Sequence, residues 1–356
     1  MAVGSKGWAR MLASVSGRSS ELASLAEWAA QRIATHEGVT SSVVLTHTPH
    51  MGYGLAAAGP VKTGELVLQV PRAIWGPVSA QHASDLAKQR VPKFVEQVET
   101  VKQQLVQQGV WGTHRFTDGV LLALHILFER GDPNGTAHPY INTLTPPDVP
   151  LFWSKEDLEA LTCTHSLHAT KDHAAFTRGV VGALLPENGA ITLPSYAWAT
   201  SLILSRAVSG SEWPFTMVPI FDFLNHSINP TALHYFNADT QTVEVRVLRD
   251  HAAGEEVFIS YGDLPNDRLL HIYGFALPHN PHNRAVLAPK WPPLGDSGTL
   301  EALKDALLAR NQLFPTPTVE IRSYPESDEQ SGPSKESIHG TGVEIKSSLE
   351  SDEQSG

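Results

Sequence analysis

Two glycines, three pairs of histidines and a group of polar and aromatic residues in the second half of the chain could carry chemistry. The segment Gly52-Tyr53-Gly54-Leu55-Ala56-Ala57 satisfies the G-x-G-x-x-A fingerprint of dinucleotide-binding turns. That fingerprint requires a helix directly after the second glycine, because the helix amides receive the pyrophosphate. Gly59-Pro60 and Gly64 interrupt the residues that follow, so we reject a dinucleotide-binding fold. What remains is a turn where glycine lets the backbone approach a ligand closely, or an ordinary hairpin.

Histidine is abundant, at 17 residues, and the pattern H-x-x-H occurs at His47/His50, His165/His168 and His279/His282. Two such histidines can share a helix face and bind a metal, but a metal site also needs a third ligand and oriented supporting groups. The chain has no H-E-x-x-H motif, and its single cysteine, Cys163, can form neither an internal disulfide nor a cysteine-rich zinc site. We therefore expect no metal and a reducing, intracellular compartment. A metal-dependent hydrolase built on the histidine pairs is an alternative that metal analysis would exclude.

The polar and aromatic group lies between Arg206 and Phe275 and is the strongest constellation in the chain. Its parts are Leu204-Ser205-Arg206, Pro219-Ile220-Phe221-Asp222-Phe223-Leu224-Asn225-His226-Ser227, Gly254-Glu255-Glu256-Val257-Phe258-Ile259-Ser260-Tyr261-Gly262 and Asn266-Asp267-Arg268-Leu269-Leu270-His271-Ile272-Tyr273-Gly274-Phe275.

Two strand-rich blocks, with a helical block between them, must position these residues. Strands are predicted at 42–45, 54–58 and 65–70, and again at 242–249 and 257–261, where apolar and polar residues alternate. Helical periodicity predicts a first helix over 20–36, before Gly38. The helices of the central block are predicted at 91–108, 118–130, 155–162, 172–185 and 195–207, and a last one at 299–312. The sheet is therefore assembled from both ends of the chain.

The composition is that of an ordinary globular protein large enough for one large or two ordinary domains. The chain has 356 residues, 41% of them hydrophobic and 18% charged. No apolar run reaches the ~18 residues of a membrane-spanning helix. The net charge of −11 argues against binding nucleic acid by general phosphate neutralisation. Much of that charge lies in 320–356. Residues 323–356 are rich in Ser, Glu and Gly and repeat the sequence ESDEQSG; we expect them to be disordered.

The ordered set of motifs resembles the SET-domain protein methyltransferases of the subclass typified by the plant Rubisco large-subunit lysine methyltransferase. Asn225-His226-Ser227 matches the N-H-S signature of that family, and Glu256 to Gly262 matches the strand that ends in its catalytic tyrosine. Tyr273-Gly274-Phe275 matches the segment that closes the lysine channel, and Gly52-Tyr53-Gly54 with the strand that follows matches the first SET segment. The resemblance covers roughly 25–289 and implies an α+β fold, a SET β-fold of short strands with a pseudoknot, a large helical insertion between its two halves and a truncated helical C-terminal region.

The resemblance also implies an activity and a site. S-adenosyl-L-methionine (AdoMet) is the expected methyl donor, bound at Gly52, Tyr53 and Gly54, with Arg206 pairing with its carboxylate and Asn225 and His226 holding adenine and ribose. Tyr261 is the expected catalytic residue, positioning the methyl group and the attacking nitrogen. The expected substrate channel comprises Phe221, Asp222, Tyr273 and Phe275, whose aromatic faces suit a methylated amine; core packing is the alternative for Phe275, and Asp222 either orients the Asn225 loop or acts near the channel.

The expected substrate is a lysine of a non-histone protein. A sister branch methylates actin histidine, and it places an asparagine two residues after its equivalent of Arg206 and a tryptophan just before its equivalent of Asp222. This chain has Val208 and Phe221 there, so the polar partner for an imidazole nitrogen is missing. Relatives continue into a large helical domain that docks the substrate, and of this domain the sequence offers only 299–322, which resembles its first helix. A non-catalytic SET-like interaction module is therefore a further alternative.

The expected organisation assigns each part of the chain a role. Residues 1–20 are a basic segment, read as a targeting peptide or a disordered terminus, and 21–79 hold the first helix and the first SET segment. The helical insertion is 80–194 and the second SET segment 195–290, followed by the start of a substrate-binding domain at 291–322 and the acidic tail at 323–356. We expect a monomer that acts on protein and binds neither nucleic acid nor membrane. Its expected compartment is the cytoplasm or nucleus, with plastid or mitochondrion as the alternative that the basic segment offers.

Overall fold

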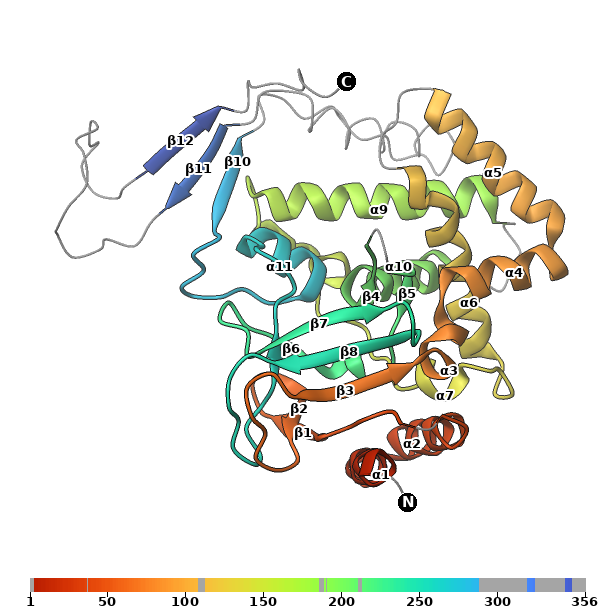
Figure 1. Ribbon diagram of the computed structural model, residues 1–356. Coiled ribbons are helices and arrows are strands. Elements are labelled where there is room, and N and C mark those ends of the chain that lie inside the picture. Colours follow the sequence, from red (N-terminus) through yellow and green to blue (C-terminus); the bar gives the residue numbers. More distant parts are fainter. Residues whose placement is uncertain are drawn as a thin grey trace, which may run out of the picture. The chain divides into compact units, whose positions relative to one another are not determined.

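The computed structural model describes residues 3–36, 38–107, 113–185, 189, 191–210, 213–287, 319–323 and 343–347 (Figure 1). The chain divides into two compact units. Unit 1 consists of Met1–Thr100, His114–Pro146 and Pro194–Gly262, and unit 2 consists of Val101–Thr113, Pro147–Leu193 and Asp263–Gly356. Both predicted strand blocks fall in unit 1.

The strands of unit 1 are short and form several small sheets. They are β1 (Val43–Thr48), β2 (Gly52–Ala57), β3 (Leu66–Pro71), β4 (Ala207–Val208), β5 (Thr216–Met217), β6 (Asn225–His226), β7 (Ala232–Asn237), β8 (Thr242–Val247) and β9 (Phe258–Ile259). The largest sheet has the order β3-β8-β7, and β1-β2, β4-β5 and β6-β9 pair separately. All these pairs are antiparallel except β6-β9, which is parallel.

The two strand blocks meet, as the sequence predicts. Strand β3 from the first block lies beside β8 from the second, with Leu68 opposite Val245 (Figure 1). An isolated bridge joins Ala56 of β2 to Glu256 just before β9. Segments far apart in the sequence, such as those that carry the bridged residues Ala56 and Glu256, therefore lie in one unit. This agrees with an α+β SET fold.

Strand β8 shows how the sequence builds the core of this sheet. Val243, Val245 and Val247 are almost completely buried, as their alternation predicts. Glu244 is also buried, at 4% exposure, although the alternation places it on the polar face. Its carboxylate accepts hydrogen bonds from the four side chains of Gln69, Tyr235, Asn237 and Thr242. Those donors replace water, which is the condition for burying a carboxylate.

The N-terminal segment is a packed helix rather than a disordered terminus. Helix α1 (Val3–Ser16) packs against α2 (Ser20–Ile33) and β1. Trp8, Met11 and Val15 are buried to 1% exposure or less. The Ser19 hydroxyl caps α2 by accepting a hydrogen bond from the backbone N–H of Leu22. The expectation of a disordered terminus is wrong for 3–16, because a stripe of large apolar residues at helical spacing outweighs the basic, serine-rich composition.

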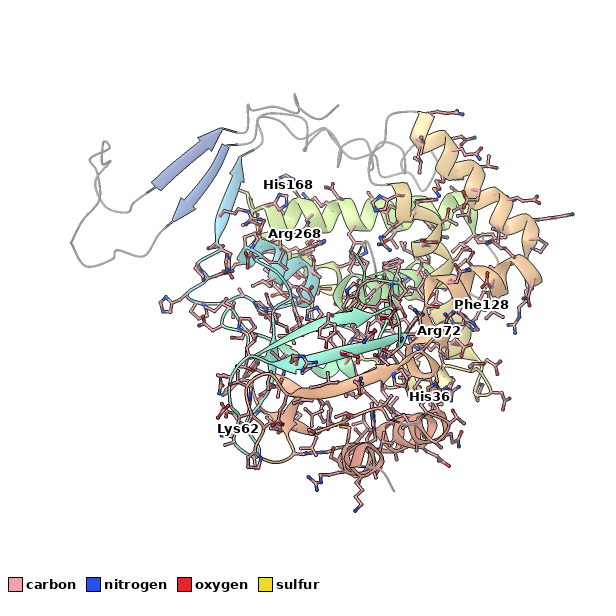
Figure 2. All side chains as sticks on the ribbon, viewed as in Figure 1. His36, Lys62, Arg72, Phe128, His168 and Arg268 are labelled. Carbon is pink, nitrogen blue, oxygen red and sulfur yellow. The ribbon has the colours of Figure 1, made fainter. Side chains whose placement is uncertain are left out.

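The other helices of unit 1 come from the insertion and from the segments that flank it. They are α3 (Arg72–Trp75), η1 (Gly76–Val78), α4 (Ala80–Arg90), α6 (Phe116–Gly131), α7 (His138–Ile141), α10 (Leu193–Arg206) and η4 (Phe221–Phe223); α5 (Pro92–Gln107) and η2 (Thr113–Arg115) run across the boundary between the units. Residues 196–203 of α10 are all buried, whereas Phe128 of α6 is 60% exposed (Figure 2). No helix among the described residues has the length and apolar character needed to cross a membrane.

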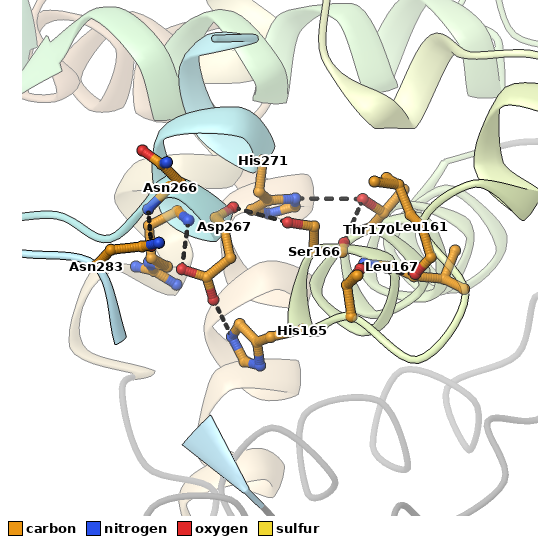
Figure 3. A network of polar contacts seen from close by, with 11 residues as sticks. Leu161, His165, Ser166, Leu167, Thr170, Asn266, Asp267, His271 and Asn283 are labelled. Atoms are coloured by element: carbon orange, nitrogen blue, oxygen red, sulfur yellow. Dashed lines mark hydrogen bonds and ion pairs between the residues drawn. The ribbon is translucent and has the colours of Figure 1, made fainter. Parts of the chain in front are cut away.

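Unit 2 is organised around the contact between α9 (His165–Leu184) and α11 (Asn266–Tyr273). Ser166 Oγ donates to the carbonyl of Asp267 at 3.1 Å, and His165 Nε2 lies 3.8 Å from the Asp267 carboxylate (Figure 3). Desolvation lowers the pKa of His165. Unit 2 also contains η3 (Pro150–Phe152), α8 (Lys155–Glu159) and the antiparallel sheet of β10 (Arg284–Leu287), β11 (Val319–Ser323) and β12 (Val343–Ser347).

The expected C-terminal elements fall largely outside the described residues. The helix predicted at 299–312, and with it nearly all of the expected start of a substrate-binding domain, lies there. So does most of the expected acidic tail. The exceptions are β11 and β12, which are strands where the sequence predicts no regular structure.

Candidate functional site

The expected site residues of unit 1 come from four segments of the chain. Gly52, Tyr53 and Gly54 lie in β2, Arg206 is the last residue of α10, and Tyr261 follows β9. Phe221 and Asp222 lie in η4, and Asn225 and His226 form β6. Tyr273 and Phe275 belong to unit 2.

Parallel pairing of β6 with β9 brings the N-H-S segment beside the strand that leads to Tyr261. Asn225 lies opposite Phe258 and His226 opposite Ile259. The backbone N–H of Tyr261 donates to Nδ1 of His226 at 3.0 Å, and the two rings lie 5.2 Å apart between centroids. Because Nδ1 accepts this bond, a neutral His226 carries its proton on Nε2.

The Tyr261 hydroxyl has a defined donor direction. It donates to the backbone carbonyl of Leu224 at 2.7 Å, and Leu224 is 1% exposed. The phenol proton is thereby directed at the protein, so the lone pairs of the same oxygen are the part of the group that can accept an N–H. This arrangement suits a hydroxyl that orients an attacking nitrogen.

Asn225 is fixed against β2 by a residue to which the sequence assigned no role. Its Nδ2 donates to Glu256 Oε1 at 2.8 Å and to the carbonyl of Tyr53 at 3.2 Å. A Cβ built at Gly54 would collide with the Glu256 carboxylate and lie 2.8 Å from Asn225 Nδ2. Gly54 is therefore required for the close approach of these side chains. Glu256 positions Asn225. The only indication of this role in the sequence is that Glu256 belongs to the 256–262 motif that ends in Tyr261-Gly262.

Gly52 differs from Gly54 because the space beside it is open. Its φ of +72° is in the left-handed region, which favours glycine. A Cβ built there meets no atom within 4 Å. The neighbouring Tyr53 is 37% exposed and packs edge-on against Phe223, with ring centroids 6.2 Å apart. The backbone at Gly52 thus borders open space, and the expected contact of Gly52 with a ligand stays a prediction.

Arg206 pairs with a protein carboxylate, Asp222. Its Nη1 donates to Asp222 Oδ2 at 2.9 Å and to the Asp222 carbonyl at 3.2 Å. Burial opposes the charged guanidinium, but the charge and hydrogen bond of Asp222, together with the nearby Tyr140 and Tyr261, outweigh burial, and the pKa of Arg206 is raised. The Asp222 side chain is 4% exposed, and its Oδ1 is buried without a hydrogen-bond partner among the described residues. Such a carboxylate oxygen can accept a hydrogen bond from a bound group.

Backbone strain lies directly before this carboxylate. Ile220 has φ of 76° and ψ of −49°, a conformation that is uncommon for a β-branched residue. It is completely buried, and burial helps to hold it in place. The next residue, Phe221, is 4% exposed and packs against His234, with ring centroids 5.3 Å apart. Strain of this kind gathers at functional sites, which supports a site at Asp222.

Tyr273 and Phe275 occupy the end of α11 in unit 2. Their rings lie 6.1 Å apart, and Gly274 between them ends the helix with φ of 82°. A Cβ at Gly274 would collide with the carbonyl of Asp148. Burial raises the pKa of Tyr273. The expected channel role of Tyr273 and Phe275 stays a prediction.

The described residues contain no group of three His, Cys, Asp or Glu side chains that could hold a metal ion. Of the expected histidine pairs, His165 faces Asp267 and His282 Nε2 lies 3.4 Å from Asp263. His47 packs edge-on against Tyr53, with ring centroids 5.0 Å apart. These histidines take part in ring packing and polar contacts.

One further site residue escaped sequence reasoning. Tyr140 of α7 donates its hydroxyl to Asp222 Oδ2 at 2.9 Å. It lies in the helical insertion, 82 residues from Asp222 in sequence, and no local pattern connects the two positions.

Three comparisons with known proteins place this geometry in context. The family model of the SET domain matches residues 52–262, which is more than half of the chain. Actin-histidine N-methyltransferases from Canis lupus familiaris and Gallus gallus are 28% and 27% identical to the chain, over 84% and 80% of it and over 50% and 47% of their own lengths. The chain thus spans about half the length of the curated relatives it matches.

Two solved structures share the fold of the chain. One is a crystal structure of the SET domain of LSMT bound to lysine and AdoHcy, with a TM-score of 0.60 and 20% identity. The other is a structure of Rubisco LSMT bound to AdoMet, with a TM-score of 0.60 and 21% identity. Each match covers 76% of this chain and 59% of the other. At these identities the likeness shows the fold alone.

Proposed function

Because the chain belongs to the SET-domain family, we propose that it is an AdoMet-dependent protein-lysine N-methyltransferase. The observation that carries the proposal is the pairing of β6 with β9, which seats Tyr261 against His226 and the carbonyl of Leu224. Tyr261 is the proposed catalytic residue. The AdoMet named with one structural neighbour and the AdoHcy named with the other support the choice of cofactor.

The residues of unit 1 fit AdoMet by the chemistry of their groups. The open space at Gly52 admits a ligand against the backbone. Arg206 donates to Asp222 through Nη1. A guanidinium has further N–H donors in the same plane, which can bind a ligand carboxylate. Asn225 and His226, both held by hydrogen bonds, are the proposed partners of adenine and ribose.

The cofactor supplies an electrophilic methyl group on a sulfonium. The protein must hold an attacking nitrogen in its neutral form, since a lysine ammonium, with an ordinary pKa of about 10.4, has no lone pair for attack. The Tyr261 oxygen accepts one N–H of that nitrogen, because its own proton is committed to Leu224. Asp222 Oδ1, which has no hydrogen-bond partner among the described residues, is the proposed second acceptor. Two fixed acceptors orient the lone pair of the nitrogen, and orientation accounts for a large part of the rate gain in reactions of this type.

Lysine is the proposed nucleophile because the side chains of Val208 and Phe221 offer no hydrogen-bonding group to an imidazole nitrogen. Val208 lies in β4 opposite Thr216 and offers only carbon atoms from its side chain. Phe221 is buried against His234 and likewise offers no donor or acceptor. A primary amine carries two N–H groups when neutral and needs acceptors, which Tyr261 and Asp222 provide.

A histidine nucleophile is the second candidate. The observation that favours it is the name of the matching relatives, actin-histidine N-methyltransferase, at 27–28% identity. In this case Asp222 Oδ1 would accept the N–H of a neutral imidazole. A protein substrate is common to both candidates.

Titration of the purified protein with AdoMet, by calorimetry, tests the cofactor assignment. Transfer of a labelled methyl group from AdoMet to proteins of a cell extract tests the activity. We expect saturable binding and a labelled protein band. Binding without labelling would favour the SET-like interaction module over the enzyme, and absence of binding would contradict the cofactor assignment.

A further inference from the structure

Tyr140 reaches the candidate site from the helical insertion. It is 1% exposed, and its hydroxyl donates to Asp222 Oδ2 at 2.9 Å. Arg206 Nη1 donates to the same oxygen, also at 2.9 Å. Two donors on Oδ2, one from α7 and one from α10, fix the plane of the carboxylate. They leave Oδ1 as the oxygen without a partner among the described residues.

The segment that carries Tyr140 is held firmly by its surroundings. The carbonyl of Thr136 accepts from Trp28 Nε1 at 2.6 Å and from Arg32 Nη2 at 3.0 Å. The backbone N–H of Ala137 donates to the buried Glu129 carboxylate at 2.6 Å. Helix α2 and helix α6 therefore both anchor the start of α7. A hydroxyl mounted on so constrained a segment sets the direction of its hydrogen bond with little freedom.

The hydroxyl also keeps its proton over the whole range of an activity assay. Burial raises the pKa of Tyr140 well above its ordinary value, and the negative charge of Asp222 adds to this. Tyr140 is thus a permanent donor toward Asp222 and cannot take up a proton from a substrate. Its contribution must pass through the carboxylate.

We propose that Tyr140 is a positioning residue, which orients Asp222 so that Oδ1 faces the nitrogen of the substrate. This inference rests on the proposed function. Without the Tyr140 hydroxyl, Asp222 Oδ2 keeps one donor, Arg206 Nη1. The carboxylate can then rotate about the Cβ–Cγ bond of Asp222, and Oδ1 loses its fixed direction. Arg206 still neutralises the charge, so the loss is one of geometry.

Tyr140→Phe removes only the hydroxyl, and Tyr196→Phe is a matched control. Tyr196 is also fully buried in unit 1 and its hydroxyl has no partner among the described residues. We expect Tyr140→Phe to lower kcat about 10- to 100-fold, the size of effect produced by a misplaced catalytic group. The affinity for AdoMet, measured by calorimetry, should change less than about twofold. Tyr196→Phe should leave kcat unchanged.

A double-mutant cycle shows whether Tyr140 acts through Asp222. In an Asp222→Asn background we expect Tyr140→Phe to lower kcat no further than about twofold, because the group it orients is already altered. Full additivity of the two losses would overturn the proposal, as would an unchanged kcat in Tyr140→Phe. A wild-type protein with no transfer activity would instead overturn the proposed function, and the positioning role with it.

A readout on the protein without cofactor tests the contact itself. In protein labelled with ¹³C at the tyrosine Cζ, the Tyr140 resonance, assigned by its loss in Tyr140→Phe, should show no ionisation where exposed phenols titrate. In Asp222→Asn its pKa should fall, because the charge that opposes ionisation is gone. An unchanged Tyr140 titration in Asp222→Asn would contradict the contact on which the proposal depends.

Discussion

Replacing Tyr261 by phenylalanine separates the chemical role of its hydroxyl from its structural role. The change removes the hydrogen bond from the hydroxyl to the carbonyl of Leu224, at 2.7 Å. It keeps the ring that packs against His226 and the backbone N–H that donates to His226 Nδ1. The perturbation is therefore confined to one oxygen atom.

The two roles differ in expected magnitude. Loss of one hydrogen bond that leaves a buried carbonyl without its partner lowers the free energy of unfolding by about 1–3 kcal/mol. Loss of a group that orients the attacking nitrogen should lower methyl transfer at least about a hundredfold, or about 3 kcal/mol of barrier. Because the affected oxygen is one group among several in the proposed cofactor site, AdoMet affinity should stay within a few-fold of the wild type.

Urea unfolding, calorimetric titration with AdoMet and labelled methyl transfer measure these three quantities. Tyr235→Phe is a suitable control, since it removes a hydroxyl that donates to Glu244 at 2.6 Å within the same unit but outside the site. We expect it to lower the free energy of unfolding without lowering transfer. Equal transfer by wild type and Tyr261→Phe would refute the role assigned to Tyr261.

Three further predictions concern the ligand site and the stability of unit 1. Arg206→Ala should weaken AdoMet binding at least about tenfold in calorimetry, because a charge-assisted contact is lost; unchanged affinity would remove Arg206 from the site. Gly54→Ala should abolish AdoMet binding, since its Cβ would lie 2.8 Å from Asn225 Nδ2 and disturb the side chain that binds the ligand. Gly52→Ala should lower the free energy of unfolding by only about 1–2 kcal/mol, from its positive φ, but its Cβ would enter the space proposed for AdoMet and should weaken binding in calorimetry; unchanged AdoMet affinity in Gly52→Ala would contradict the placement of the ligand there. Hydrogen bonds from Lys62 and Thr63 lower the pKa of Asp250 to about 2. The Asp250 carboxylate therefore stabilises the fold above its ordinary pKa, and this stabilisation is lost as the pH falls toward 2. Asp250→Asn should flatten the fall of melting temperature between about pH 4 and pH 2, and an identical acid profile would refute the assignment.

The strand blocks and the site motifs could be predicted because their signals are local. Alternation of Val243, Val245 and Val247 predicts β8, and helical periodicity predicts a helix at 195–207, where the structure has α10 at Leu193–Arg206. Strand β9 is shorter than the predicted 257–261, at Phe258–Ile259. The backbone N–H of Val257 donates to the carbonyl of Leu55 in β2 instead, and that of Tyr261 donates to the side chain of His226 rather than to a neighbouring strand.

The contacts that fix the site could not be predicted, because they join distant segments. Glu256 is 31 residues from Asn225, and Tyr140 is 82 from Asp222. Glutamate and tyrosine occur at many positions of the chain, so residue type alone does not indicate that Glu256 contacts Asn225 or that Tyr140 contacts Asp222. The same reason explains why Arg206, expected to pair with a ligand carboxylate, also has a partner in Asp222.

Helix α1 could have been predicted from the spacing of its apolar residues, but the basic, serine-rich composition of 1–20 favoured the other interpretation. Trp8, Met11, Leu12 and Val15 have helical spacing and are all buried. The basic charge and the serines of the same segment describe only the exposed side of that helix. Composition therefore indicated a disordered or targeting segment, whereas periodicity indicated the packed helix that the structure has.

The identity of the methylated amino acid tests the central claim most directly. Wild-type protein is incubated with AdoMet carrying a labelled methyl group and a cell extract, and the labelled protein is hydrolysed to amino acids and separated. The account predicts that the label is recovered as N-methylated lysine and is absent when Tyr261→Phe replaces the wild type. Recovery of the label as methylhistidine would contradict the lysine assignment, and absence of label from protein would contradict the proposed activity.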